Sequence, residues 1–285
     1  MCTPDWGAHT QSDCKVSIAP DRTMAADSPD KFVDYEVSGG IAVIKLARPP
    51  VNALGFAMVR RLIAALEQAG ADDAVRAVVL ASAVSKRFCA GLDIVDLAGR
   101  SPDEICVLVH ALYVELFEAQ YQLGKPSIAA VNGAARGGGM TLAVSCDVIV
   151  AAASATFGYP EIDLGVLPAI HFVHLPRIIG RHRAFELLFT GGAFDAAHAA
   201  ALGLVNRVVP DGELEAQALK VAGEFAGKPQ AAMRAGRAAF MRQFDGDYRR
   251  GIAEAVDDFC NIIATEEAQA ALRAFAEKNR SKSRT

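Results

Sequence analysis

Apolar and polar residues alternate in two short segments near the start of the patterned part of the sequence. Phe32–Val37 and Ile41–Leu46 follow a two-residue period on either side of Gly39-Gly40, which predicts two strands joined by a hairpin turn. Apolar residues then recur at helical spacing over Phe56–Ala69, and the run AVVLA (Ala77–Ala81) contains no polar residue, as expected for a buried strand. Strands that alternate with helices predict an α/β fold.

The same alternation continues to about residue 152 and then gives way to helical patterns. Ser127–Val131 and Val148–Ala151 are further predicted strands, and Pro102–Gln122 is a predicted helix. Beyond about residue 175 one strand is expected, at Val205–Val209. The other predicted segments there are helices: Arg183–Thr190, Asp195–Ala201, Glu213–Ala226, Gln230–Arg242 and Arg249–Lys278. We therefore expect a flexible arm at residues 1–30, an α/β core at 31–204 and a helical C-terminal region at 205–285.

Composition and charge exclude several classes of protein. The chain has 52% hydrophobic and 22% charged residues, a net charge of -4 and no apolar run long enough to span a membrane. This slightly acidic balance argues against a nucleic-acid partner. The six cysteines are scattered without CxxC spacing, which predicts reduced thiols and a cytoplasmic location. Because no cluster of ligand residues appears, we expect no metal and no cofactor.

The segment AAVNGAARGGGMTLAVSCD (129–147) is the most informative part of the sequence. Its three consecutive glycines stand between a predicted strand and a helix, where glycine permits close approach of the backbone. Amide N–H groups in the first turn of a helix have no internal partner, so such a site suits an anion. Neither the P-loop spacing nor the dinucleotide-binding spacing is present. Two interpretations stay open, an oxyanion site and tight packing of strand against helix.

A second segment, RFCAGLD (87–93), favours the oxyanion interpretation. It follows the strand AVVLA and contains Ala90-Gly91 at a predicted turn. Such a turn directs the backbone N–H of Leu92 outward, and together with the N–H of Gly138 it would provide two converging donors for an enolate oxygen.

These segments resemble the crotonase superfamily, also called the enoyl-CoA hydratase/isomerase family. The matching motifs are RPPVNAL (48–54), FCAGLDI (88–94), the glycine segment, FGYPEIDLGVLP (157–168) and TGGAFDAAHAAALGLVNRVVP (190–210). The resemblance implies an acyl-CoA substrate, whose enolate is held by the amides of Leu92 and Gly138. It also implies a spiral of ββα units followed by helices that assemble trimers, commonly stacked as hexamers.

The resemblance does not fix the reaction. Hydratases of the family place one glutamate after the glycines and another in the PE-x-x-x-G segment; here the second is Glu161, but the first position is Thr141. A threonine is no general base near neutral pH, although it can position water. A single glutamate is similar to the Δ3,Δ2-enoyl-CoA isomerases, so the sequence slightly favours movement of a double bond over hydration.

Other residues are expected to contact the substrate. Ala90 and Asp93 lie beside the predicted oxyanion turn, Tyr159 and His171 lie near the acyl group, and Lys86 and Arg87 are the nearest cations for the phosphates of coenzyme A. Two alternatives remain. One is another crotonase reaction, thioester hydrolysis or decarboxylation, and the other is a non-catalytic or RNA-binding protein on this fold.

Overall fold

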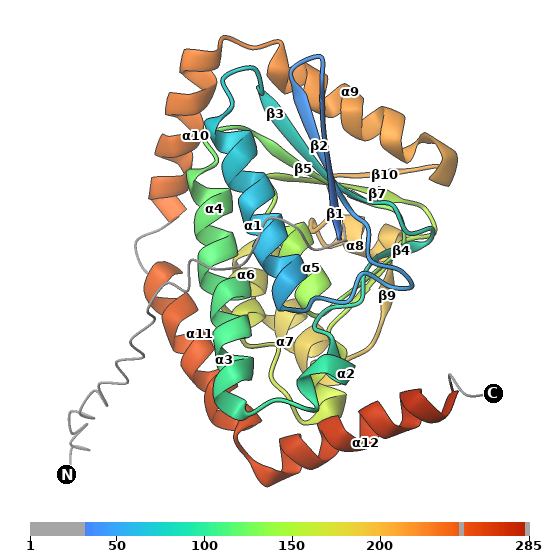
Figure 1. Cartoon of the computed structure of the whole chain (residues 1–285). Helices are drawn as coiled ribbons and strands as arrows, with labels where there is room; N and C mark the ends of the chain where they lie inside the picture. Colours follow the sequence, from blue (N-terminus) through green and yellow to red (C-terminus); the bar gives the residue numbers. More distant parts are fainter. Residues whose placement is uncertain (1–31, 245–247, 283–285) are drawn as a thin grey trace. The chain divides into compact units, whose positions relative to one another are not determined.

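Two β-sheets organise the described part of the chain, residues 32–244 and 248–282, in the computed structural model (Figure 1). The predicted arm at residues 1–30 lies outside these residues. The larger sheet has the strand order β1-β2-β3-β5-β7-β10, in which β1 and β2 form the predicted antiparallel hairpin and all other neighbours are parallel. Its strands are β1 (Val33–Ser38), β2 (Ile41–Leu46), β3 (Ala77–Ser82), β5 (Ser127–Val131), β7 (Val148–Ala152) and β10 (Arg207–Val209).

The smaller sheet has the order β4-β6-β8-β9. Its strands are β4 (Arg87–Cys89), β6 (Ala134–Arg136), β8 (Thr156–Gly158) and β9 (Phe194–Asp195). Each of β3, β5 and β7 in the larger sheet is followed a few residues later by β4, β6 or β8 in the smaller one, so the chain repeats a strand–strand–helix unit. This confirms the predicted spiral of ββα units. The strand β9 also corrects the expectation of a single strand beyond residue 175.

Helices cover both sheets and extend beyond them (Figure 1). Helix α9 packs on β2, β3, β5 and β7, so a helix from the predicted C-terminal region belongs to the α/β body. The helices are α1 (Phe56–Ala71), α2 (Ile94–Leu97), α3 (Pro102–His110), α4 (Leu116–Gln122), α5 (Gly138–Val144), α6 (Ala169–Ile179), α7 (Arg181–Thr190), α8 (Ala196–Ala201), α9 (Leu214–Ala226), α10 (Gln230–Phe244), α11 (Tyr248–Ile263) and α12 (Glu266–Lys282), with a π-helix η1 (Ala111–Glu115) and 3₁₀-helices η2 (Pro160–Leu164) and η3 (Asp211–Glu213). Among the residues described, no helix is both long and apolar enough to cross a membrane.

Burial explains why the central strands have no polar alternation. Every residue of β5 is buried, and the first four of β3 are too, because parallel strands in the middle of such a sheet are covered on both faces. In contrast, β2 alternates between buried and half-buried positions. Its sequence therefore keeps the two-residue period of a strand with one covered face.

Two segments predicted as single helices differ from that prediction in the structure. The segment predicted as one helix at Pro102–Gln122 is continuous but contains the π-helical turn η1. The segment Arg249–Lys278 forms two helices, α11 and α12. Between them the Thr265 hydroxyl accepts a hydrogen bond from the Ala268 N–H and so caps the start of α12.

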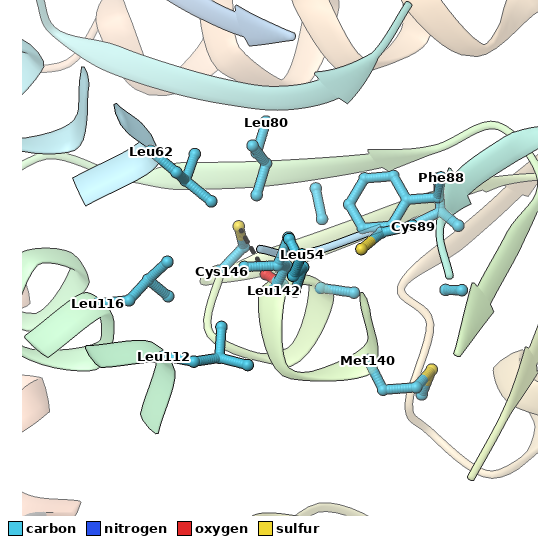
Figure 2. Close-up of a cluster of buried hydrophobic side chains, with 14 of the residues drawn as sticks. Leu54, Leu62, Leu80, Phe88, Cys89, Leu112, Leu116, Met140, Leu142 and Cys146 are labelled. Atoms are coloured by element: carbon cyan, nitrogen blue, oxygen red, sulfur yellow. Dashed lines mark hydrogen bonds between the residues drawn. The ribbon is translucent and has the colours of Figure 1, made fainter. Parts of the chain in front are cut away.

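Helix α5 lies inside the hydrophobic core. Its residues from Gly138 to Ala143 are all buried, and Figure 2 shows Met140 and Leu142 among side chains from other elements, including Leu80, Phe88 and Leu112. A helix enclosed in this way is held on several sides. The amide groups at its first turn therefore have a fixed position.

The cysteines do not all carry free thiols, contrary to the sequence prediction. Cys106 on α3 and Cys260 on α11 form a disulfide across 154 residues of sequence. Cys89 and Cys146 are free and buried. The prediction failed because residues that far apart give no spacing signal, and only the packing of α11 against α3 brings the two sulfur atoms together.

Candidate active site

The turn after β4 is fixed by a short segment from the earlier RPPVNAL motif. Leu54 forms a parallel bridge with Leu92: its N–H donates to the Gly91 carbonyl at 2.7 Å, and its carbonyl accepts from the Asp93 N–H at 3.0 Å. These bonds use the two neighbours of Leu92. The N–H of Leu92 itself therefore points away from Leu54.

The second amide of the predicted pair belongs to Gly138, the first residue of α5, whose N–H has no acceptor within the helix. A methyl group placed on Gly91 would lie 3.1 Å from the Gly138 nitrogen, so the two turns touch. The structure thus brings the turns of Leu92 and Gly138 together, as the sequence predicts.

Glu161 stands directly against the glycine turn. It lies in η2, and its Oε1 would be only 2.6 Å from a methyl group on Gly137, a residue whose φ of +49° also favours glycine. Burial raises the pKa of the Glu161 carboxyl to about 7, and the hydrogen bond from its own amide opposes this shift. Its Oε2 is enclosed and has no hydrogen-bond partner within the described residues. A carboxyl group in this state accepts and returns protons near neutral pH.

A pocket of about 220 Å³ joins these groups. Leu92, Gly138 and Glu161 line it together with Ala90, a residue that the sequence analysis expects to contact the substrate. Its remaining wall is largely apolar and includes residues from both C-terminal helices. These wall residues include Ile94, Leu97, Tyr113, Val166, Phe259, Ile263, Leu272 and Phe275. The arrangement combines amide donors, the Glu161 carboxyl group and the more exposed Asp163 in a pocket suited to an apolar chain.

Three of the predicted site residues form a separate buried cluster that does not line this pocket. Thr141 Oγ1 lies 3.2 Å from His171 Nε2, and the ring of Tyr159 contacts the His171 ring at a tilt of 59°, with centroids 4.6 Å apart. Burial lowers the pKa of His171 to about 3, opposed by the nearby Gly137 carbonyl, so the imidazole is neutral. The cluster contacts the glycine turn through His171 and the Gly137 backbone, and the Thr141 hydroxyl is directed at His171.

Asp93, Lys86 and Arg87, the charged residues predicted to contact the substrate, do not line this pocket. Asp93 pairs with Arg48 at 2.7 Å and accepts a hydrogen bond from the Asp96 N–H at the start of α2. Lys86 and Arg87 are exposed where β4 begins, whereas the turn of Leu92 follows its end, and neither lines the pocket. Their predicted contact with the phosphates of coenzyme A therefore stays a prediction.

Sequence reasoning missed two residues. Asn52 fixes the segment before Leu54: its amide donates to the Phe88 carbonyl at 2.9 Å and its Oδ1 accepts from the Arg48 N–H. Tyr113 lines the pocket from η1. The motif around Asn52 was recognised without a role, whereas nothing in the local pattern distinguishes Tyr113 from a core aromatic residue.

The fold and this site together define a class, and comparison with known proteins identifies it. Residues 36–283 match the profile of the Enoyl-CoA hydratase/isomerase family, and the chain belongs to this family, within the crotonase superfamily. Crotonyl-CoA hydratase of Syntrophomonas wolfei is 35% identical over 242 residues, which are 84% of this chain and 93% of that protein.

Two solved structures illustrate the range of the family. The human mitochondrial delta3-delta2-enoyl-CoA isomerase has a TM-score of 0.79 at 29% identity, covering 88% of this chain and 99% of that one. The enoyl-CoA hydratase of Bacillus anthracis has a TM-score of 0.73 at 33% identity, covering 87% of this chain and 97% of that one. The family therefore includes similar structures with two different named reactions.

Proposed function

We propose that this chain moves the double bond of an enoyl-CoA thioester, with Glu161 as the acid/base group and the amides of Leu92 and Gly138 as the oxyanion hole. Glu161 takes a proton from C2 of a 3-enoyl-CoA, and the electron pair moves toward the thioester carbonyl. The enolate oxygen is stabilised by the two amides. Glu161 then returns the proton to C4, leaving the double bond between C2 and C3.

The observation that carries this proposal is the position of one carboxyl group beside the glycine turn. Glu161 has a pKa of about 7, close to the value that favours transfer in both directions at neutral pH. Hydratases have a further glutamate just after the glycines, and that position is Thr141 here, whose hydroxyl lies against His171. A mechanism with one carboxylate needs no second base.

Hydration is the second candidate, and the similar proteins favour it. Crotonyl-CoA hydratase of Syntrophomonas wolfei and a probable enoyl-CoA hydratase of Rhizobium meliloti, 36% identical, both carry hydratase names. Water addition would use the same enolate and the same glutamate. The two candidates therefore share their site and differ in whether oxygen enters the product.

The experiment offers 3-enoyl-CoA and 2-trans-enoyl-CoA to the protein in heavy water. Deuterium at C4 of a 2-enoyl product without added oxygen supports isomerisation, and a 3-hydroxyacyl product supports hydration. We expect Glu161→Gln to lower turnover by about 10²- to 10⁴-fold while acyl-CoA binding is retained.

Glu67→Gln on the exposed face of α1 serves as the matched control and should leave turnover unchanged. Acyl-CoA binding without turnover by the unmodified protein would instead favour a non-catalytic role. Equal turnover by the Glu161 variant would remove that residue from the mechanism.

A further inference from the structure

Tyr113 occupies an unusual place in the wall of the acyl pocket. It lies in η1, and π-helical turns inside α-helices are frequent at functional sites. Its side chain is 2% exposed, and its ring meets Phe259 of α11 edge to face at 6.3 Å. The position of the ring is thus fixed by packing, and the ring and Glu161 line the same pocket.

The hydroxyl of Tyr113 is available to a molecule in the pocket. Within the described residues it makes no hydrogen bond, and it is not among the enclosed polar atoms, which do include the hydroxyl of Tyr159. Burial and the nearby charge of Glu161 raise the pKa of Tyr113 far above its usual value. The hydroxyl therefore stays protonated and keeps both its donor and its acceptor capacity.

No other side chain of the pocket offers the same chemistry beside Glu161. Thr141 is turned toward His171, and the remaining carboxylate of the pocket, Asp163, belongs to an exposed residue. A water molecule beside Glu161 needs a second polar partner to keep its orientation. Tyr113 is the hydroxyl-bearing residue of the pocket wall, among the residues described, that meets this need.

We propose that Tyr113 is the specificity-determining residue of this site: its hydroxyl holds a water molecule beside Glu161 and thereby adds hydration to the reactions that the pocket performs. The proposal rests on the proposed function, because it requires the same enolate. It assigns to Tyr113 a positioning role, since the residue binds the attacking water and transfers no proton itself.

The step uses water as its only co-reactant. The water oxygen forms a bond to C3 of a 2-enoyl-CoA, while the electron pair of the C2–C3 double bond moves toward the thioester carbonyl. Glu161 takes a proton from this water and then gives a proton to C2 as the enolate collapses. Enoyl-CoA and water thus give 3-hydroxyacyl-CoA, and Tyr113 keeps its hydrogen throughout.

The test is Tyr113→Phe, which keeps the ring and its contact with Phe259 and removes the hydroxyl alone. Two rates are measured on the same protein: 3-hydroxyacyl formation from 2-trans-enoyl-CoA, and double-bond movement in 3-enoyl-CoA. We expect hydration to fall about 10- to 100-fold, the effect of one hydrogen bond to a reacting group, while double-bond movement changes little. Tyr35→Phe, on β1, is the matched control and should change neither rate.

The outcomes separate this proposal from the proposed function. A fall in both rates together, or in neither, overturns the role of Tyr113, because a merely structural residue does not change their ratio. Double-bond movement without any hydration by the unmodified protein also overturns it and leaves the proposed function standing. If the unmodified protein catalyses neither reaction, the proposed function itself is refuted.

Should Tyr113→Phe lower the melting temperature strongly, Tyr113→Trp provides a second variant whose larger ring occupies the site of the water. The same selective loss of hydration is expected from it. Retained hydration in that variant would count against the proposal.

Discussion

Glu161 links the chemistry of the site to the stability of the fold. Its pKa rises from 4.5 to about 7 on burial, so between these two pH values the folded protein binds more protons than the unfolded chain. The free energy of unfolding must then decrease as the pH rises through this window. For this one group the decrease amounts to about 3 kcal/mol.

We expect Glu161→Gln to remove this dependence on pH. Relative to the unmodified protein, the variant should gain about 3 kcal/mol in free energy of unfolding between pH 5 and pH 8, because a neutral amide loses no proton there. Urea denaturation of both proteins at the two pH values measures the difference. The buried histidines His171 and His174 stay neutral in both folded proteins over this range, so their contribution is the same in both and cancels in the comparison. Parallel stability curves would mean that the carboxyl group is not buried as described.

Gly91 provides a second prediction at the scale of one residue. It has a φ of +89°, and a methyl group there would lie 2.8 Å from the Arg136 carbonyl oxygen. We expect Gly91→Ala to displace the turn that carries the Leu92 amide and to lower kcat by about 10²- to 10³-fold, as the loss of one oxyanion donor does. Steady-state kinetics with an enoyl-CoA measures the effect.

The matched control is Gly39→Ala in the β1–β2 turn. Gly39 also has a positive φ, +57°, but a methyl group there meets nothing within 4 Å. This variant should lose some stability through backbone strain and keep its kcat. Equal kinetic losses in both variants would show that strain alone explains the result.

At the scale of elements, the Cys106–Cys260 disulfide joins α3 to α11 beside the pocket. Phe259, the neighbour of Cys260, lines the pocket and contacts Tyr113. A disulfide across so long a separation restricts the unfolded chain, and such bonds typically contribute about 2–4 kcal/mol.

We expect Cys260→Ser to lower the free energy of unfolding by about that amount and to lower the melting temperature. Dithiothreitol should have the same effect on the unmodified protein and no further effect on the variant, which serves as its own control. Calorimetry with and without the reductant measures both. If dithiothreitol leaves the melting temperature of the unmodified protein unchanged, the presence of the disulfide is contradicted.

The elements differ in how well the sequence predicts them, for physical reasons. The strands of the larger sheet are predicted because most of them are apolar runs or alternating segments of five or six residues. The strand β10 has only three residues but lies within the predicted segment Val205–Val209. The strands β4, β6, β8 and β9 have two or three residues, too few for any period to be visible. Helix α6 was not predicted because Pro176 lies inside it, and proline in a sequence normally argues against a helix.

The site, too, has residues that the sequence predicts well and residues that it does not. Glu161, Leu92 and Gly138 stand in motifs whose order along the chain is specific, and the structure places all three in one pocket. The roles of Thr141, Tyr159 and His171 depend on which way each side chain turns, which no linear pattern records. Lys86 and Arg87 do not line this pocket, and their predicted contact with the phosphates of coenzyme A stays a prediction.

At the scale of the whole molecule, the pocket is completed by the last part of the chain. Helix α12 packs against α2 (Figure 1). It also packs against η2, the element that carries Glu161, and it supplies Leu272 and Phe275 to the pocket wall. Exposed aromatic residues such as Phe185 and Phe240 remain on the described surface, and assembly into trimers or hexamers stays a prediction.

We expect removal of residues 265–285 to raise KM by at least about tenfold, because the acyl chain loses two apolar contacts. The shortened protein should also expose Glu161 to water and bring its pKa closer to 4.5. Kinetics over a range of pH measures both effects. Phe275→Ala, which keeps α12 in place, is the control and should raise KM with a smaller change in pKa. An unchanged KM in the shortened protein would show that α12 does not close the pocket.

The late position of these wall residues has a consequence for biosynthesis. A ribosome adds Leu92, Gly138 and Glu161 well before it adds Leu272 and Phe275, so these pocket residues are synthesised before part of the wall that covers them. The pocket wall is complete only once α12 has been synthesised. A chain that stops before α12 is therefore expected to lack part of the pocket wall even where its α/β body has already folded.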